Sequence, residues 1–168
     1  IDDLQDGWCV GLFSVANIKI VPYEKENIIC YDNHYIIGKS DKQSNNFDVI
    51  LFSCRNIQEA IIPHFIKRID SHSFEFCQNL RKVEFSDEIK SLSIGNDAFY
   101  RCPIESIYFP SCFIELSESW CSNMTKLTSI LISPLNKQFI FFNGDYLVGK
   151  SDLESDIYDI LYYVARDI

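Results

Sequence analysis

The sequence predicts a β-rich α/β repeat protein, in which short strands stack into a solenoid with a parallel β-sheet on one face and inserted β-hairpins. Three observations support this class. Aromatic residues make up 14% of the chain, which favours strands. Charged residues make up 23%, which is typical of a globular protein. The chain also repeats itself with a long period of about 111 residues and a short one of about 23–24 residues. At 168 residues, we expect a single solenoid domain over 1–168.

The long period is visible as a duplicated segment. "YIIGKSDKQSNNFDVILFSCRNI" at 35–57 aligns without gaps to "YLVGKSDLESDIYDILYYVARDI" at 146–168. Upstream, with one insertion, "IKIVP" at 18–22 matches "ILISP" at 130–134. The chain therefore contains one full long repeat and most of the start of the next.

The short period covers residues 56–134 and places one apolar strand in each unit. Its steps are "IIP" at 61–63, "VEF" at 83–85, "IYFP" at 107–110 and "ILISP" at 130–134. Alternation along a strand turns Val83 and Phe85 inward and Glu84 outward. A period of 20–29 residues with this apolar spacing is typical of a leucine-rich-repeat solenoid. On the opposite side we expect irregular or short helical turns.

Aromatic residues recur between these strands, once in each unit. We expect Phe74, Phe99 and Trp120 to stack as an internal ladder, because stacked units bury equivalent positions against one another. Cys77 and Cys102 would lie beside the ladder as small buried side chains.

The segment "GDYLVGKS", Gly144–Ser151, fits the phosphate-binding pattern G-x-x-x-x-G-K-[ST]. A phosphate loop needs a flexible interior and a following helix, whereas "DYLV" is bulky and strand-like. "NG" at 143–144 is a strong hairpin signal, and Asp32-Asn33 serves the same turn in the first copy, which lacks the leading glycine. We therefore predict hairpin modules at about 28–55 and 139–164, and no nucleotide binding at Gly144–Ser151.

Charge and cysteine usage exclude several classes of function. The net charge of −9 argues against nucleic-acid partners and against docking on anionic lipid. No apolar run is long enough to insert into a membrane. The seven cysteines are odd in number, widely spaced and without a C-x-x-C pair, so we expect mostly buried free thiols. His34, His64 and His72 are far apart in sequence, and no catalytic, cofactor-binding or metal-binding residues are predicted.

The strongest candidate site is the outward face of the strands. Taking one residue from each unit gives a row of Lys19, Ile61, Glu84, Tyr108 and Leu131. Stacked strands lie about 4.8 Å apart, so this row would form a continuous strip. Solenoids use such extended faces to bind proteins. The sequence therefore predicts a protein-binding strand face and no enzyme activity.

Two segments resemble a known family. "SFEFCQNLRKVEF" at 73–85 and "AFYRCPIESIYFP" at 98–110 are similar to BspA-like leucine-rich repeats, which occur in surface antigens of anaerobic bacteria and mucosal protist parasites. The resemblance covers nearly the whole chain and implies a secreted or cell-surface adhesin that binds host or matrix protein. The alternative is an intracellular, cytoplasmic structural scaffold, because the chain shows no signal peptide and its cysteines look unpaired.

Overall fold

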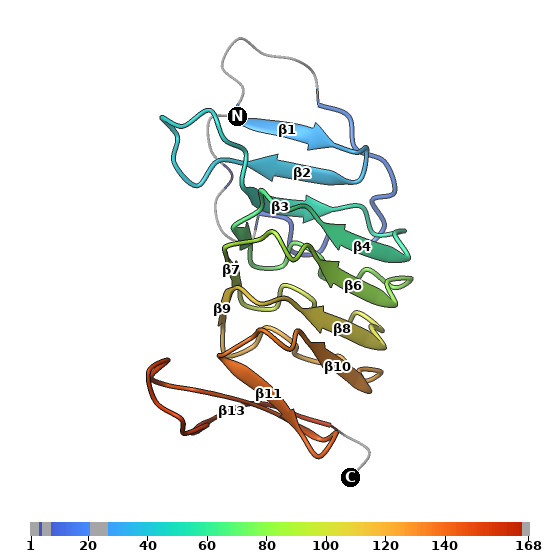
Figure 1. The fold of residues 1–168 in the computed structure, drawn as a ribbon. Helices are drawn as coiled ribbons and strands as arrows, with labels where there is room; N and C mark the ends of the chain where they lie inside the picture. Colours follow the sequence, from blue (N-terminus) through green and yellow to red (C-terminus); the bar gives the residue numbers. More distant parts are fainter. Residues whose placement is uncertain (1–3, 5–7, 21–26, 166–168) are drawn as a thin grey trace.

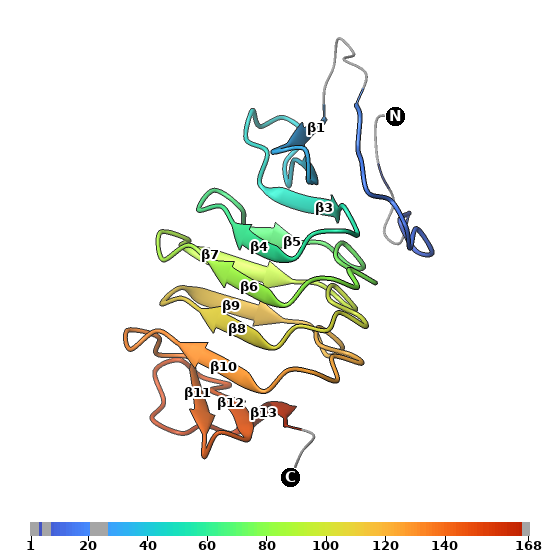
Figure 2. The ribbon, with the colours of Figure 1, turned by 90° about the vertical axis from the view of Figure 1, so that its right-hand side faces the viewer.

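The chain forms a stack of β-coils in the computed structural model, which describes residue 4, residues 8–20 and residues 27–165. Each coil places one strand on the front of the stack and one on the back (Figures 1 and 2). The front sheet is parallel, in the order β10-β8-β6-β4. Its strands are β4 (Glu59–Ile62), β6 (Lys82–Phe85), β8 (Ser106–Phe109) and β10 (Ser129–Ile132).

The back of the stack is a second parallel sheet, and the prediction of an α/β fold is wrong. The back strands β5 (Arg68–Ile69), β7 (Ser91–Ile94) and β9 (Phe113–Leu116) pair in that order, and the described residues contain no helix. The physical reason is that the back segment of a coil alternates polar and apolar residues over a few positions. In "SLSI", for example, Leu92 and Ile94 are buried, which is the period of a strand and not of a helix. The solenoid itself is confirmed.

Both faces enclose one continuous core. The predicted ladder begins as expected, because the rings of Phe74 and Phe99 lie 5.1 Å apart. Trp120 is buried too, but its ring packs against the ring of Phe109, with the ring centres 5.9 Å apart. Cys77 and Cys102 are buried beside the ladder, and the Cys102 thiol donates to the carbonyl of Phe74. Burial of each large apolar side chain stabilises the stack by about 1.5–3 kcal/mol.

Each hairpin segment contributes three antiparallel strands. The first holds β1 (Ile28–Tyr31), β2 (Tyr35–Gly38) and β3 (Val49–Ser53), and the second holds β11 (Phe139–Phe142), β12 (Tyr146–Gly149) and β13 (Ile160–Val164). Their tight turns are as predicted. Asp32, Asn33, Asn143 and Gly144 all have positive φ, the left-handed conformation that such hairpin turns require.

The first hairpin module belongs to the back sheet only. β3 pairs with β5 in parallel, so the back sheet runs continuously in the order β1-β2-β3-β5-β7-β9. The front sheet has no corresponding strand beyond β4 among the described residues. The module thus extends the back of the stack while ending the front sheet.

The first long repeat departs from the second near its start. The match of 18–22 to 130–134 predicts a front strand that would carry Lys19, but residues 18–20 form no strand, and residues 21–22 lie outside the described residues. Instead, the segment before them binds the side of the stack, where Arg55 N donates to Val15 O and Arg55 Nε donates to Leu12 O. Figure 2 shows this segment beside the stack. Lys19 therefore lies outside the front sheet.

Candidate functional site

Four of the five predicted row residues lie side by side on the front sheet. The strand register pairs Ile61 with Glu84, Glu84 with Tyr108, and Tyr108 with Leu131. Ile61 is 64% exposed and Leu131 58%, whereas the other two are half-buried. The row thus has an exposed aliphatic side chain at each end and two polar side chains between them. We call Ile61, Glu84, Tyr108 and Leu131 the front row.

The two polar members of the front row are fixed by neighbours. Glu84 forms an ion pair with Lys82 on the same strand. The Tyr108 hydroxyl donates to Asp87 Oδ1 at 2.8 Å, and this hydrogen bond raises the pKa of Tyr108. Both polar side chains thus have a partner on their own strand or in the turn beside it.

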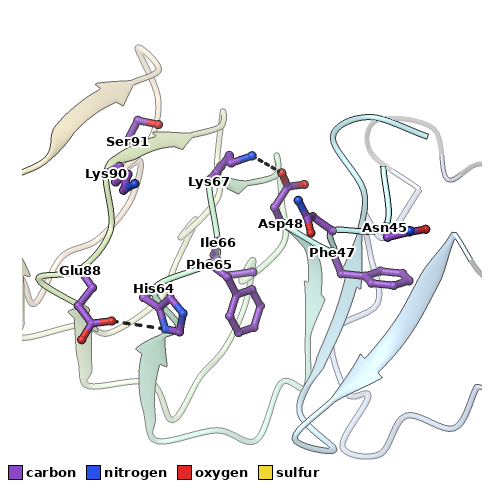
Figure 3. A pocket seen from close by; sticks show the side chains of 11 residues that line it. Asn45, Phe47, Asp48, His64, Phe65, Ile66, Lys67, Glu88, Lys90 and Ser91 are labelled. Atoms are coloured by element: carbon purple, nitrogen blue, oxygen red, sulfur yellow. Dashed lines mark hydrogen bonds and ion pairs between the residues drawn. The ribbon is translucent and has the colours of Figure 1, made fainter. Parts of the chain in front are cut away.

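A pocket of about 460 Å³ borders the carboxyl ends of β4 and β6 (Figure 3). Three segments line it: the loop of the first hairpin module, the turn after β4 and the turn between β6 and β7. The lining residues include Phe47, His64, Phe65, Glu88 and Lys90. Because these residues come from segments distant in sequence, no local motif could have predicted the pocket.

One ion pair and one histidine–carboxylate contact lie in this pocket. Lys67 Nζ lies 2.9 Å from Asp48 Oδ2, and His64 Nδ1 lies 3.9 Å from Glu88 Oε2. Burial alone would raise the pKa of Asp48, but hydrogen bonds from Ser40 and Lys67 outweigh it and hold that pKa below its ordinary value. The pocket therefore combines two phenylalanine rings with a charged rim, a lining that suits a side chain of a protein partner.

The segment "GDYLVGKS" forms the predicted hairpin, and the serine of its GKS motif binds a carboxylate. Ser151 N and Ser151 Oγ both donate to the carboxylate of Asp159, at 2.8 and 2.5 Å. Lys150 Nζ lies 5.1 Å from the centre of the Tyr158 ring. The groups that would bind a phosphate thus already bind a carboxylate, and the chain continues into β13.

The first copy repeats this arrangement. Ser40 N and Ser40 Oγ donate to the carboxylate of Asp48, both at 2.8 Å, and Lys39 Nζ lies 4.9 Å from the centre of the Phe47 ring. The glycine of each GKS has a packing role. A Cβ on Gly38 would lie 2.7 Å from Leu51 Cδ1, and one on Gly149 would lie 2.6 Å from Tyr162 Cε2. The motif therefore closes a hairpin loop.

The histidines do not come together. His34, His64 and His72 lie nearest to the carboxylates of Asp32, Glu88 and Glu75, respectively. Over the described ranges, no group of three or more His, Cys, Asp or Glu side chains could hold a metal ion. No helix long and apolar enough to cross a bilayer occurs in the same part of the chain.

Four of the seven cysteines lack the environment of a nucleophile, whereas the effect of burial on the pKa of the Cys77 thiol is outweighed by hydrogen bonding and by the nearby Arg55 guanidinium, which lower it. None of the seven forms a disulfide in this structure. Burial raises the pKa of the Cys9, Cys54 and Cys102 thiols, and it raises that of Cys112 to about 11. Since the thiolate is the reactive form, these four thiols are poorly suited to covalent catalysis.

Comparison with known proteins identifies the family. The model of the BspA type leucine rich repeat region matches in six copies over residues 46–160, so the chain belongs to this family. No curated protein matches. One solved structure, a leucine rich cell surface protein from Faecalibacterium prausnitzii, matches at 22% identity with a TM-score of 0.42, covering 64% of this chain and 40% of the other. The chain thus spans less than half of that protein's resolved length.

Leucine-rich-repeat families are in general non-enzymatic modules for protein interaction. The BspA-type family and the solenoid fold therefore define the class of this chain as a leucine-rich-repeat protein-interaction module.

Proposed function

We propose that this chain is a non-enzymatic recognition module whose protein partner binds across the front row. The observation that carries the proposal is the strand register, which aligns Ile61, Glu84, Tyr108 and Leu131 across four neighbouring strands. Most of the surface of Ile61 and Leu131 is available to a partner. Burial of such a side chain contributes about 1.5–3 kcal/mol.

The pocket beside β4 and β6 extends this surface. Its His64–Glu88 pair lies directly after the front strands, next to the Asp87 carboxylate that holds Tyr108. A partner lying across the front row would therefore reach the pocket with one side chain. An apolar side chain buried in a pocket and surrounded by polar contacts is a common anchor of a protein interface.

The biological setting that we propose is a surface antigen or adhesin that binds host or matrix protein. Membership of the BspA-type family supports this setting. The seven free thiols favour the alternative, an intracellular structural scaffold. Thiol titration of freshly isolated native protein separates the two, because disulfides would indicate secretion and seven reactive thiols after unfolding would indicate a reducing compartment.

Replacement of Tyr108→Ser together with Leu131→Ser tests the proposal. We expect binding to immobilised matrix proteins and epithelial cells to fall at least tenfold, since one lost aliphatic contact already accounts for that factor. Leu161→Ser is the matched control, because Leu161 is exposed to the same extent as Leu131 but lies on β13 of the second hairpin module, which is not part of the front sheet. Unchanged affinity in the double variant, with an intact circular dichroism spectrum, would exclude the front row as the binding surface.

A further inference from the structure

Among the residues that the structure describes, the strand β4 has an open hydrogen-bonding edge. It pairs with β6 on one side, and the front sheet ends with it. Arg81 N donates to Gln58 O and Ser86 N donates to Ile62 O, so the backbone groups of the even-numbered residues face β6. Because these groups alternate along a strand, the N–H and C=O groups of Glu59 and Ile61 face the open edge.

A second pocket of about 460 Å³ lies along this edge. One side is β4 itself, with Glu59 and Ile61. The other side is the turn of the first hairpin, with Tyr31, Asp32 and His34. Figure 1 shows this turn above β4 on the same side of the stack. The space exists because the hairpin module adds strands to the back sheet and leaves the next front position open.

The pocket has the chemistry of a strand site with a charge preference. Its inner side contains Tyr35 and Ile57, both buried, which would receive an apolar side chain. Its charged lining residues, within the described ranges of the chain, are the exposed acids Asp32 and Glu59, with no lysine or arginine. An added strand that alternates apolar and basic residues would therefore satisfy the backbone, the apolar floor and the acidic rim together.

We propose that the open edge of β4 binds an extended, lysine- or arginine-containing segment of a protein partner by strand addition. This inference rests on the proposed function and specifies the partner's chemistry. The added strand pairs with Glu59 and Ile61, and its outward side chains continue the front row beyond Ile61. Main-chain hydrogen bonds supply affinity in such complexes, and the alternate side chains supply specificity.

A second copy of this chain fits the edge less well than a basic segment. Two β4 edges brought together would place Glu59 and Asp32 of both copies against one another, and each copy carries a net charge of −9. Like charges across a strand pair destabilise it. The charge of the edge therefore selects a cationic partner.

The probe for this site is a capped nine-residue peptide of alternating lysine and valine, with glutamate replacing lysine in a second peptide. Amide hydrogen exchange of the whole chain is followed by NMR at millimolar peptide. We expect the lysine peptide to slow exchange at Glu59 and Ile61 at least tenfold, and the glutamate peptide to leave it within twofold. No protection, equal protection by both peptides, or protection that grows with protein concentration alone would each overturn the proposal.

Ile61→Pro removes the N–H that faces the edge and leaves the β6 ladder intact, since proline is tolerated on edge strands. It should weaken binding of the lysine peptide at least tenfold, whereas Ile61→Val, which keeps the N–H, should not. Asp32→Asn with Glu59→Gln gives a second test that does not alter the backbone, and unchanged affinity there would contradict the charge preference. The double variant Tyr108→Ser and Leu131→Ser should leave peptide binding unchanged. The proposal for the β4 edge and the proposal for the front row are therefore tested separately.

Discussion

Asp48 and Asp159 hold the same position in two copies of one loop, but their surroundings differ. Each carboxylate accepts two hydrogen bonds from the serine of its GKS motif. The coil that follows the first copy buries Asp48 and adds the ammonium of Lys67 at 2.9 Å, whereas Asp159 remains exposed. The same serine–aspartate hydrogen bonds therefore lie in a buried setting in one copy and an exposed setting in the other.

We predict that Asp48→Asn destabilises the fold by about 1–3 kcal/mol, because it leaves buried donors without a charged acceptor. Asp159→Asn should lower the free energy of unfolding by a clearly smaller amount. The pKa of Asp48 is lowered in the folded state, so its contribution is present above the unfolded pKa of about 3.9 and is lost as the pH falls through the folded value. Urea unfolding at pH 7 and pH 3 measures the free energy of unfolding of the original protein and of both variants. The difference between the original protein and Asp48→Asn should be smaller at pH 3. Equal losses for both variants would contradict it.

At the scale of elements, Gln138 joins the solenoid to the second hairpin module. Its buried side chain accepts from Ile114 N at 2.8 Å and donates to Ile114 O at 2.7 Å. Ile114 belongs to β9, and Gln138 directly precedes β11. The side-chain amide thus completes the backbone bonding of β9, where a neighbouring strand would otherwise do so.

We predict that Gln138→Ala costs about 1–3 kcal/mol, because it leaves the backbone groups of Ile114 buried without a partner. Gln138→Glu should also destabilise at neutral pH, since a carboxylate can accept from Ile114 N but cannot donate to Ile114 O. The exposed Gln78→Ala is the control and should change the free energy of unfolding by less than about 0.5 kcal/mol. A Gln138→Ala variant as stable as this control would show that the bridge contributes nothing.

The GKS loops give the third prediction. Because Ser151 N and Oγ already bind Asp159, we expect no saturable binding of ATP or GTP in isothermal titration calorimetry. A micromolar Kd that Lys150→Ala abolishes would contradict this interpretation.

Strand alternation made part of this structure predictable. "KVEF" buries Val83 and Phe85, and the four residues of the two predicted hairpin turns, Asp32, Asn33, Asn143 and Gly144, all have positive φ. The back sheet was missed because its segments were expected to form irregular or short helical turns, although β7 alternates buried and outward residues as the front strands do. Only β5, with two residues, is too short to show that alternation. Lys19 was placed wrongly because Arg55 binds the N-terminal segment to the side of the stack. Both pockets depend on loops that meet only after folding, so no local pattern indicates them.

At the scale of the whole molecule, the two faces of the stack differ in extent. The back sheet continues from β9 to β1 through the first hairpin module, whereas the front sheet contains four strands in the described part of the chain. Front-row side chains, a bordering pocket and an open edge all lie on or beside these four strands. Recognition is therefore expected at the front, with the back sheet and the core as its rigid support.

Site-specific photocrosslinking tests this assignment most directly. The crosslinking residue p-benzoylphenylalanine is placed at Leu131 on the front sheet or at Glu115, an exposed position of β9 on the back sheet, and each protein is irradiated on intact epithelial cells and on matrix. We predict that Leu131 gives a discrete crosslinked protein partner and that Glu115 gives none. Crosslinking of the same partner from Glu115, with none from Leu131, would contradict recognition through the front sheet.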